Sequence, residues 1–435
     1  MLVFEKVPFI ILSLISLTIS MMSVLKYHTV VNYQMIPIYT RIYNLFVSII
    51  LYLRNIAWPV ELSILYPFPK SIPAWHFSLA LASVVLVTVI AFMTRKGRPW
   101  LIVGWCWFLV ALAPASGLIQ SGLWPAMANR FMYLPMIGLF MMVIWEGDQR
   151  LRGRYSRVLK VVLCVAMLVY FAVLTRVQNL YFSNSYALFN RCLEVAGDNE
   201  VAFNNIGDAL ASSGRVDEAM KYFAKSIKLN PKHAIAYYNY GICLVMKGDD
   251  QNAIPYFLWA IKLDPKRVNS YLNIGLIQKR RGYIDEAVKL MEKALEIDQN
   301  DLSVHYDYGM ILAEQGKFEE AIPHYVFVVR RDPTNVPARI NLSQAYEETG
   351  LYNKAMDGYK SLNEVISHNK GYIYYRIARV YSQQRRFKEC EDYLEIALKD
   401  GFSVLEFLKI DKGFINFRET KNYTRFLENQ KIKLP

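Results

Sequence analysis

A row of short polar residues recurs in the second half of the 435-residue chain, and each member lies 34 residues after the last. The row consists of Asn205, Asn239, Asn273, Asp307 and Asn341. A carboxamide offers both a hydrogen-bond donor and an acceptor, as does each peptide unit of an extended chain. Side chains repeated once per structural unit would therefore suit an extended peptide, with little dependence on its sequence. The alternative is that each side chain ties one unit to the next.

Aromatic and charged residues stand beside this row. Tyr238 and Tyr306 directly precede two of its members, so we predict that they belong to the same peptide-binding site. Further on, Lys279 and Arg280 are basic, whereas Glu347-Glu348 is acidic. Mixed charge of this kind is typical of a solvated face, and it could also select a partner by charge.

A strict repeat must position these side chains. A small residue follows each member of the row by two positions, an alanine lies twelve residues further on, and a large apolar residue lies sixteen further on. The small residues are Gly207, Gly241, Gly275, Gly309 and Ser343. This 34-residue period is typical of tetratricopeptide helix pairs, which stack because one pair cannot bury its apolar face alone. We predict six repeats over residues 199–398, with Arg376 in the row position of the sixth. A linker with a partial repeat helix is predicted at 179–198, and capping helices at 399–435.

The first part of the chain has a different composition. Residues 1–175 hold fourteen Lys and Arg against four acids, a balance of +10 out of +13 for the whole chain. Basic loops between apolar runs are membrane-topology signals, so we do not expect nucleic acid as a partner. The apolar runs are Pro8–Leu25, Ile42–Trp58, Trp75–Met93, Trp100–Ile119, Phe131–Trp145 and Val161–Thr175. We predict an all-α protein: a polytopic membrane domain of five or six spans over residues 1–178, followed by a tetratricopeptide-repeat α-solenoid.

Charge also predicts the orientation of these spans. The densest basic clusters, Arg95–Arg98 and Arg150–Lys160, should face the cytoplasm. The repeats then lie on the periplasmic or lumenal side of a bacterial inner membrane or endoplasmic reticulum. The five cysteines are scattered, without a CxxC or His/Cys cluster, so we predict no disulfide framework, no metal site and no cofactor.

Several motifs carry a family resemblance that covers nearly the whole chain. They are Glu5-Lys6 with Pro8-Phe9, Trp58-Pro59 with Tyr66-Pro67, Gly104-Trp105 with Trp107-Phe108, Gly117–Gln120, Ala126–Pro135, and Asn184-Ser185 with Leu188-Phe189. Together they resemble the later portion of the transmembrane-and-tetratricopeptide-repeat O-mannosyltransferases and their bacterial relatives. That resemblance implies a polyprenyl-phosphate sugar donor and a membrane-embedded transferase of the C-type fold. The repeats are also similar to the superhelix of O-linked N-acetylglucosamine transferase, in which such asparagines hold acceptor peptides.

The chain departs from the mannosyltransferase pattern where catalysis is expected. The match begins partway through the family's membrane domain, so the first external loop with its catalytic acids is absent. Asn129 stands where the family has an Ala-Asp-Arg step, and apart from Glu5 the predicted topology leaves Glu61 as the external acid before the repeats. We therefore predict no catalytic residues and no catalysis by this polypeptide alone.

Arg130 is the residue of this region to which we assign a binding role. Its guanidinium, at the mouth of a span, could clamp a lipid phosphate such as that of a polyprenyl-phosphate sugar. The alternative is an interfacial anchor that reaches toward headgroups.

Three functions follow from these features. The first is a membrane-anchored module whose repeats bind an extended peptide or protein outside the cytoplasm. The second is the C-terminal portion of a split or truncated glycosyltransferase, which would transfer sugar from a polyprenyl-phosphate donor to protein Ser or Thr. The third is a scaffold of an envelope or secretion complex.

Overall fold

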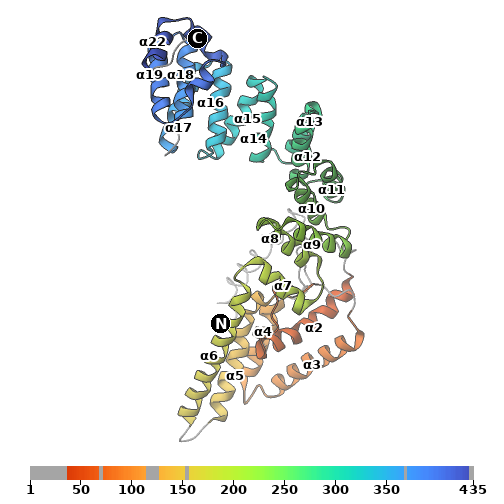
Figure 1. The fold of residues 1–435 in the computed structure, drawn as a ribbon. Helices are drawn as coiled ribbons and strands as arrows, with labels where there is room; N and C mark the ends of the chain where they lie inside the picture. The colour runs from red at the N-terminus through yellow and green to blue at the C-terminus, as the bar shows by residue number, and fades with distance from the viewer. Residues whose placement is uncertain (1–36, 68–71, 114–126, 152–155, 367–369, 431–435) are drawn as a thin grey trace, which may run out of the picture. The chain divides into compact units, whose positions relative to one another are not determined.

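The computed structural model describes residues 37–67, 72–113, 127–151, 156–366 and 370–430 (Figure 1). These residues form helices, with an isolated β-bridge between Tyr66 and Met127. The predicted all-α class is confirmed. The chain divides into two compact units, residues 1–247 and 248–435, and each is described by itself. The predicted span Pro8–Leu25 lies outside the described residues.

The first unit begins with a group of apolar helices. They are α2 (Ile38–Ala57), α3 (Ala74–Met93), α4 (Pro99–Leu112), η3 (Asn129–Met132), α5 (Pro135–Arg150) and α6 (Ser156–Tyr181). Helices α4 and α5 approach closely because Gly104 and Gly138 face each other, and a Cβ on either would collide with the backbone carbonyl of the other. Tyr52, Trp105 and Phe108 are buried in the adjoining core.

Charged residues gather at one end of the α4–α5 pair. Glu146 forms an ion pair with Arg98 at 2.9 Å and another with Arg150 at 2.7 Å. The Nε1 of Trp100 also donates to Glu146, at 3.3 Å. The start of α4 and the end of α5 therefore lie together, with basic residues at both.

Two of the described helices, α3 and α6, are apolar and long enough to cross a membrane, judged by length and composition alone. None of the apolar stretch of α6 is buried. Helix α4 ends at Leu112, so it is shorter than the predicted span Trp100–Ile119, part of which lies outside the described residues. A polytopic domain of five or six spans stays a prediction.

The remaining helices alternate in short pairs. In the first unit they are α7 (Ser185–Ala196), α8 (Glu200–Ser212), α9 (Val216–Leu229) and α10 (Ala234–Met246). In the second they are α11 (Asp250–Leu263), α12 (Val268–Arg280), α13 (Ile284–Ile297), α14 (Leu302–Glu314), α15 (Phe318–Arg331), α16 (Val336–Glu348), α17 (Tyr352–Val365), α18 (Gly371–Gln383) and α19 (Phe387–Lys399). The expected helical repeats are therefore present.

The small residues of the repeat are explained by what they touch. A Cβ at Gly207 would lie 2.7 Å from the ring of Phe223, and one at Gly309 would lie 2.8 Å from the ring of Tyr325. Each glycine thus makes room for the large side chain sixteen residues later. The turn between the two helices needs a left-handed residue, which is glycine in the preceding repeats but Arg385, with φ 60°, in the sixth.

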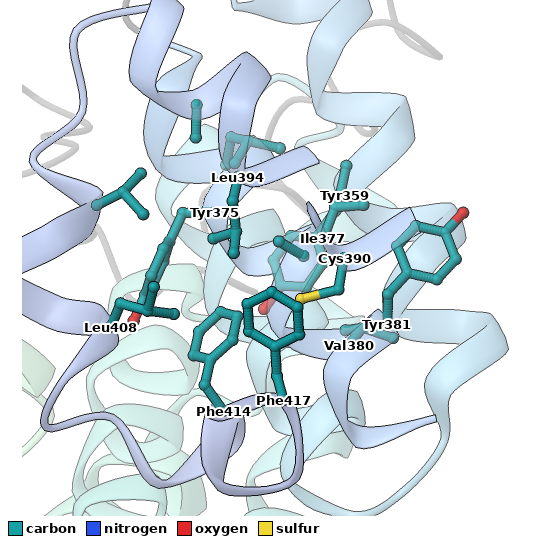
Figure 2. Close-up of a cluster of buried hydrophobic side chains, with 14 of the residues drawn as sticks. Tyr359, Tyr375, Ile377, Val380, Tyr381, Cys390, Leu394, Leu408, Phe414 and Phe417 are labelled. Atoms are coloured by element: carbon teal, nitrogen blue, oxygen red, sulfur yellow. The ribbon is translucent and has the colours of Figure 1, made fainter. Parts of the chain in front are cut away.

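After α19 the described chain forms the short helices α20 (Val404–Leu408), η4 (Lys412–Phe414), α21 (Ile415–Arg418) and α22 (Lys421–Asn429). Figure 2 shows Phe414 and Phe417 beside Cys390 in a cluster that also includes Tyr375 and Leu408. Both phenylalanines are fully buried. Each buried ring contributes about 2–3 kcal/mol of transfer free energy, so this segment covers the apolar side of the sixth repeat.

Candidate functional site

The first helices of successive repeats touch one another. Helix α8 contacts α10 in the first unit, and α12 contacts α14, which contacts α16, in the second. Within each unit, helices stacked in this way form a row. The exposed side of the row in each unit is called the first-helix face below.

The predicted polar residues all lie on these first helices. Asn205 is on α8, Asn239 on α10, Asn273 on α12, Asp307 on α14 and Asn341 on α16. All five side chains are half-buried. The first two belong to the first unit and the other three to the second. Each is thus available to both roles proposed from the sequence, a peptide contact and a tie between repeats.

Two members of the row bridge neighbouring repeats. Asn239 Nδ2 donates to Asn204 Oδ1 at 3.1 Å, and Asn341 Nδ2 donates to the hydroxyl of Tyr306 at 3.3 Å. In both cases the partner is the residue that precedes the row position of the previous repeat. These bonds match the tie between repeats that the sequence left open.

Two other members bond to their own helix. Asn205 Nδ2 donates to the carbonyl of Val201 at 2.8 Å, and Asn273 Nδ2 donates to the carbonyl of Asn269 at 2.7 Å. A carboxamide has two donor hydrogens and an oxygen with two lone pairs, so one such bond uses a fraction of its capacity. The bonds hold each side chain in a fixed place while leaving capacity for a ligand.

Asp307 is the charged member of the row. Burial raises the pKa of its carboxyl to about 6, while Lys279 opposes this rise and Asp301 adds to it. Lys279 is itself paired with Glu314 at 2.6 Å. The carboxyl of Asp307 therefore sits in surroundings that disfavour its ionised form.

The two predicted tyrosines lie on the same helices. Tyr238 is half-buried on α10, and Tyr306 is half-buried on α14. The ring of Tyr306 lies 6.3 Å from that of the buried Tyr325, and its hydroxyl accepts from Asn341. Tyr306 is thus part of the contact between two repeats as well as of the first-helix face.

In the sixth repeat the row position is built differently. Arg376 donates to Glu347 Oε2 at 2.7 Å and to the hydroxyl of Tyr359 at 3.2 Å. Arg379 donates to the other oxygen of Glu347 and, at 3.0 Å, to Asp411. The Glu347 side chain is 0% exposed, so two guanidinium groups neutralise one fully buried carboxylate.

Arg130 lies in the first unit, beside a cavity of about 730 Å³. Polar side chains on the wall include Asn55, Ser63 and Gln178, and the apolar ones include Phe140 and Phe171. Arg130 itself is exposed, and its guanidinium lies 5.2 Å from the centre of the Phe131 ring. A large, mostly apolar cavity with a cation at its edge has the chemistry of an amphipathic ligand site.

Asn129 joins two of the family motifs next to this cavity. Its Nδ2 donates to the hydroxyl of Tyr66 at 2.9 Å, and Asn55 Nδ2 donates to its Oδ1 at 3.2 Å. The hydroxyl of Tyr66 also accepts from the amide of Ser63 at 2.9 Å. The Trp58–Pro67 segment and residues 127–135 therefore meet through the neutral amide of Asn129.

Tetratricopeptide-repeat models match residues 204–268, 268–301, 290–322, 312–367 and 371–399. The second half of the chain is a tetratricopeptide-repeat array. Such arrays bind peptides or proteins, so a partner of this class is indicated. The predicted boundaries of the array, and the residues that would contact a partner, stay predictions.

Curated relatives connect part of the chain to mannosyltransferases. Protein O-mannosyl-transferase Tmtc3 of Drosophila melanogaster is 30% identical over 127 residues, which is 28% of this chain and 13% of the relative. Protein O-mannosyl-transferase TMTC3 of Mus musculus is 29% identical over 130 residues, 29% of this chain and 14% of the relative. A weak and partial similarity to these mannosyltransferases is thus shown, whereas the resemblance of the membrane motifs and the likeness to bacterial relatives stay predictions.

Solved structures resemble the array in fold. YrrB, a tetratricopeptide protein described as having an unusual peptide-binding site, is 22% identical, with a TM-score of 0.34 over 41% of this chain and 91% of that one. PilF of Pseudomonas aeruginosa is 14% identical, with a TM-score of 0.41 over 53% of this chain and 97% of that one.

The ion-pair network of the array is the feature that the sequence analysis missed. The mixed charge around Glu347-Glu348 predicts a solvated face, whereas the structure buries the Glu347 side chain completely. A signal was present, because Arg376 replaces the short polar residue of the row and Arg379 lies one helical turn later. Two arginines on one helix, about a repeat after a glutamate, indicate a charge pair across the repeat contact.

Proposed function

We propose that this chain is a membrane-anchored tetratricopeptide-repeat protein whose first-helix face binds extended peptide or protein segments outside the cytoplasm. The observation that carries the proposal is the row of half-buried short polar side chains, one on each of five first helices. Four of them are carboxamides already fixed by at least one hydrogen bond. A fixed amide with remaining capacity loses little conformational entropy when it binds a peptide backbone.

The proposal is tested with the full chain in phosphatidylcholine nanodiscs and a fluorescent, unstructured, uncharged peptide. Changing Asn205, Asn239 and Asn273 together to alanine should weaken binding at least tenfold, since three backbone contacts of about 1 kcal/mol each are lost. The matched control is Asn252→Ala, on the exposed surface of the second helix α11. Equal binding by the triple variant and the parent would refute the peptide role.

Membrane anchoring is supported by the exposed apolar surface of α6. A helix with no buried residue over its apolar stretch needs a cover of low polarity, and lipid supplies it. The basic residues at the start of α4 and the end of α5 favour a cytoplasmic position for that end, because cytoplasmic loops are enriched in Lys and Arg. Alkaline phosphatase fused after the last residue in a bacterial host should be active. If that fusion is inactive and a fluorescent cytoplasmic reporter fused at the same place is bright instead, the predicted orientation is reversed.

A second candidate function, part of a polyprenyl-phosphate-sugar-dependent protein glycosyltransferase, is favoured by the cavity beside Arg130. Its apolar wall fits an isoprenoid chain, and the guanidinium could pair with a phosphate. Acidic residues for catalysis would come from elsewhere. Arg130→Ala should reduce binding of a polyprenyl-phosphate mannose in nanodiscs at least tenfold, while Arg95→Ala, an exposed arginine, should not. Unchanged affinity in the Arg130 variant would remove this candidate.

A further inference from the structure

Asp307 differs from the rest of the polar row in having no partner. Among the residues that the structure describes, its carboxyl takes part in no hydrogen bond or ion pair, although its side chain is half-buried. The neighbouring members, Asn273 and Asn341, each donate a hydrogen bond within the array. A half-buried carboxylate without a partner carries part of a desolvation cost that a cation would offset.

The charges around Asp307 leave this position acidic. Asp301 caps the start of α14, accepting from the amides of Ser303 and Val304, and adds a second carboxylate on the same helix. Lys279 of α12 is the nearby cation, but Glu314 holds its ammonium at 2.6 Å. Lys279 is therefore shared between Glu314 and Asp307, while Asp301 adds a further negative charge near Asp307.

The other groups that face Asp307 are uncharged. They are the phenols of Tyr306 and Tyr325, from α14 and α15. The amide of Asn341, from α16, donates to the Tyr306 hydroxyl. None of these can neutralise a carboxylate, although a phenol or an amide can orient a ligand beside it. The set as a whole has a net charge of about −2 when all its acids are ionised.

We propose that Asp307 is the selectivity position of the row, where the array binds a lysine or arginine side chain of its extended partner. This rests on the proposed peptide-binding function. The carboxamides contact any peptide backbone, while the carboxylate favours partners that place a cation at the fourth repeat. Ionisation is required for this preference, so the raised pKa of Asp307 makes the preference weaken as the pH falls through about 6.

The test uses the full chain in phosphatidylcholine nanodiscs, which carry no net charge and so do not attract basic peptides. An unstructured host peptide carries one central lysine or acetyl-lysine, side chains of similar length with and without charge. At pH 7.5 the lysine peptide should bind about tenfold more tightly, the range of one charge-assisted hydrogen bond. At pH 5 the difference should shrink to about twofold.

Variants separate this inference from the general peptide role. Asp307→Asn should bring lysine-peptide affinity down to the acetyl-lysine level and leave acetyl-lysine binding unchanged, because the row is then carboxamide throughout. Asp307→Ser provides a second uncharged variant, with folding checked by circular dichroism. Asp285→Asn, an exposed carboxylate at the start of α13, is the matched control and should change nothing.

Glu314→Gln tests the environment of the site. Without Glu314, Lys279 is released to neutralise Asp307, so the lysine preference should fall although Asp307 is intact. If both peptides bind equally to the parent, the selectivity inference is overturned and the peptide-binding function stands. If neither binds, both are overturned.

Discussion

The fourth and sixth repeats place an acidic or basic side chain at the same helical position, yet they treat it in opposite ways. Asp307 is half-buried and has no ion-pair partner among the described residues, whereas Arg376 is buried and pairs with a fully buried Glu347. The Asp307 carboxylate can still pair with a ligand, whereas the Arg376 guanidinium is already paired within the fold. Position in a repeat therefore does not decide whether a charge serves binding or stability. The local set of partners decides it.

The largest loss of stability that would test this contrast between Asp307 and Arg376 is expected on substitution of Glu347. Glu347→Ala leaves Arg376 and Arg379 facing each other in a buried site, and breaking a buried pair on one side costs about 3–5 kcal/mol. Hydrogen exchange followed by mass spectrometry should show faster opening of α18, with α8 as an internal reference.

Glu348 offers the matched control for that variant. It contacts the same Arg379 at 2.9 Å, but its side chain is 28% exposed. Glu348→Ala should cost less than about 1 kcal/mol, as partly exposed ion pairs do. If the two variants lose equal protection from hydrogen exchange in α18, burial of Glu347 does not explain the strength of the ion pairs in the sixth repeat.

Substitution of Asp307 is expected to raise the stability of the array instead of lowering it. Its pKa is about 6 in the folded chain against a reference of 3.8, so the folded state holds the proton more tightly. Stability is therefore lost as the pH rises from about 4 to about 6, and it stays lower above that range. Asp307→Asn should stabilise the array at pH 7.5 by about 1.5 kcal/mol, reduced from the full shift because the side chain is partly exposed to water.

Thermal unfolding at several pH values checks this prediction. The variant should melt higher than the parent at pH 7.5 and about equally at pH 4. A parent whose midpoint rises steadily from pH 4 to pH 7.5 relative to the variant would show that Asp307 is stabilised by a charge partner in the fold, and the contrast with Arg376 would disappear.

These two positions also show how far the sequence leads. The 34-residue spacing was enough to predict the helix pairs and to place Asn205 through Asn341 on corresponding first helices, because period and helix geometry are local properties. It did not distinguish the free carboxyl of Asp307 from the paired one of Glu347. That difference depends on contacts with helices about 30 residues away, which no short pattern records.

The same limit applies to the apolar helices of the first unit. Apolar runs predicted helices there. Helix α3 matches Trp75–Met93 closely, whereas α6 extends beyond Val161–Thr175 at both ends. The hydrogen bonds of Asn129, however, join motifs about 60 residues apart. Periodicity carries no information on such pairings, since they depend on how helices pack and not on how they form.

A smaller effect separates the two roles of the carboxamides. Asn239→Ala removes a bond between repeats and should cost about 1 kcal/mol in the opening free energy of α10. Asn205→Ala removes a bond within α8 and should change it by less than about 0.5 kcal/mol, because alanine has the higher helix propensity. Hydrogen exchange of α8 and α10 measures the change in opening free energy for both variants. Equal effects would mean that the bond to Asn204 is not a tie between repeats.

The smallest expected effect is a gain in the sixth repeat. Arg385 adopts φ 60°, where a side chain costs about 1–2 kcal/mol, while the preceding repeats have glycine at this turn, with φ 74° at Gly350. Glycine also increases the entropy of the unfolded chain, which offsets part of that gain. Arg385→Gly should therefore stabilise α18 and α19 by about 0.5 kcal/mol in hydrogen exchange. Arg386→Gly is the control: its φ is −93° and it pairs with Glu389, so glycine there should destabilise. A loss of stability in both variants would show that Arg385 has a role in the repeat beyond closing the turn.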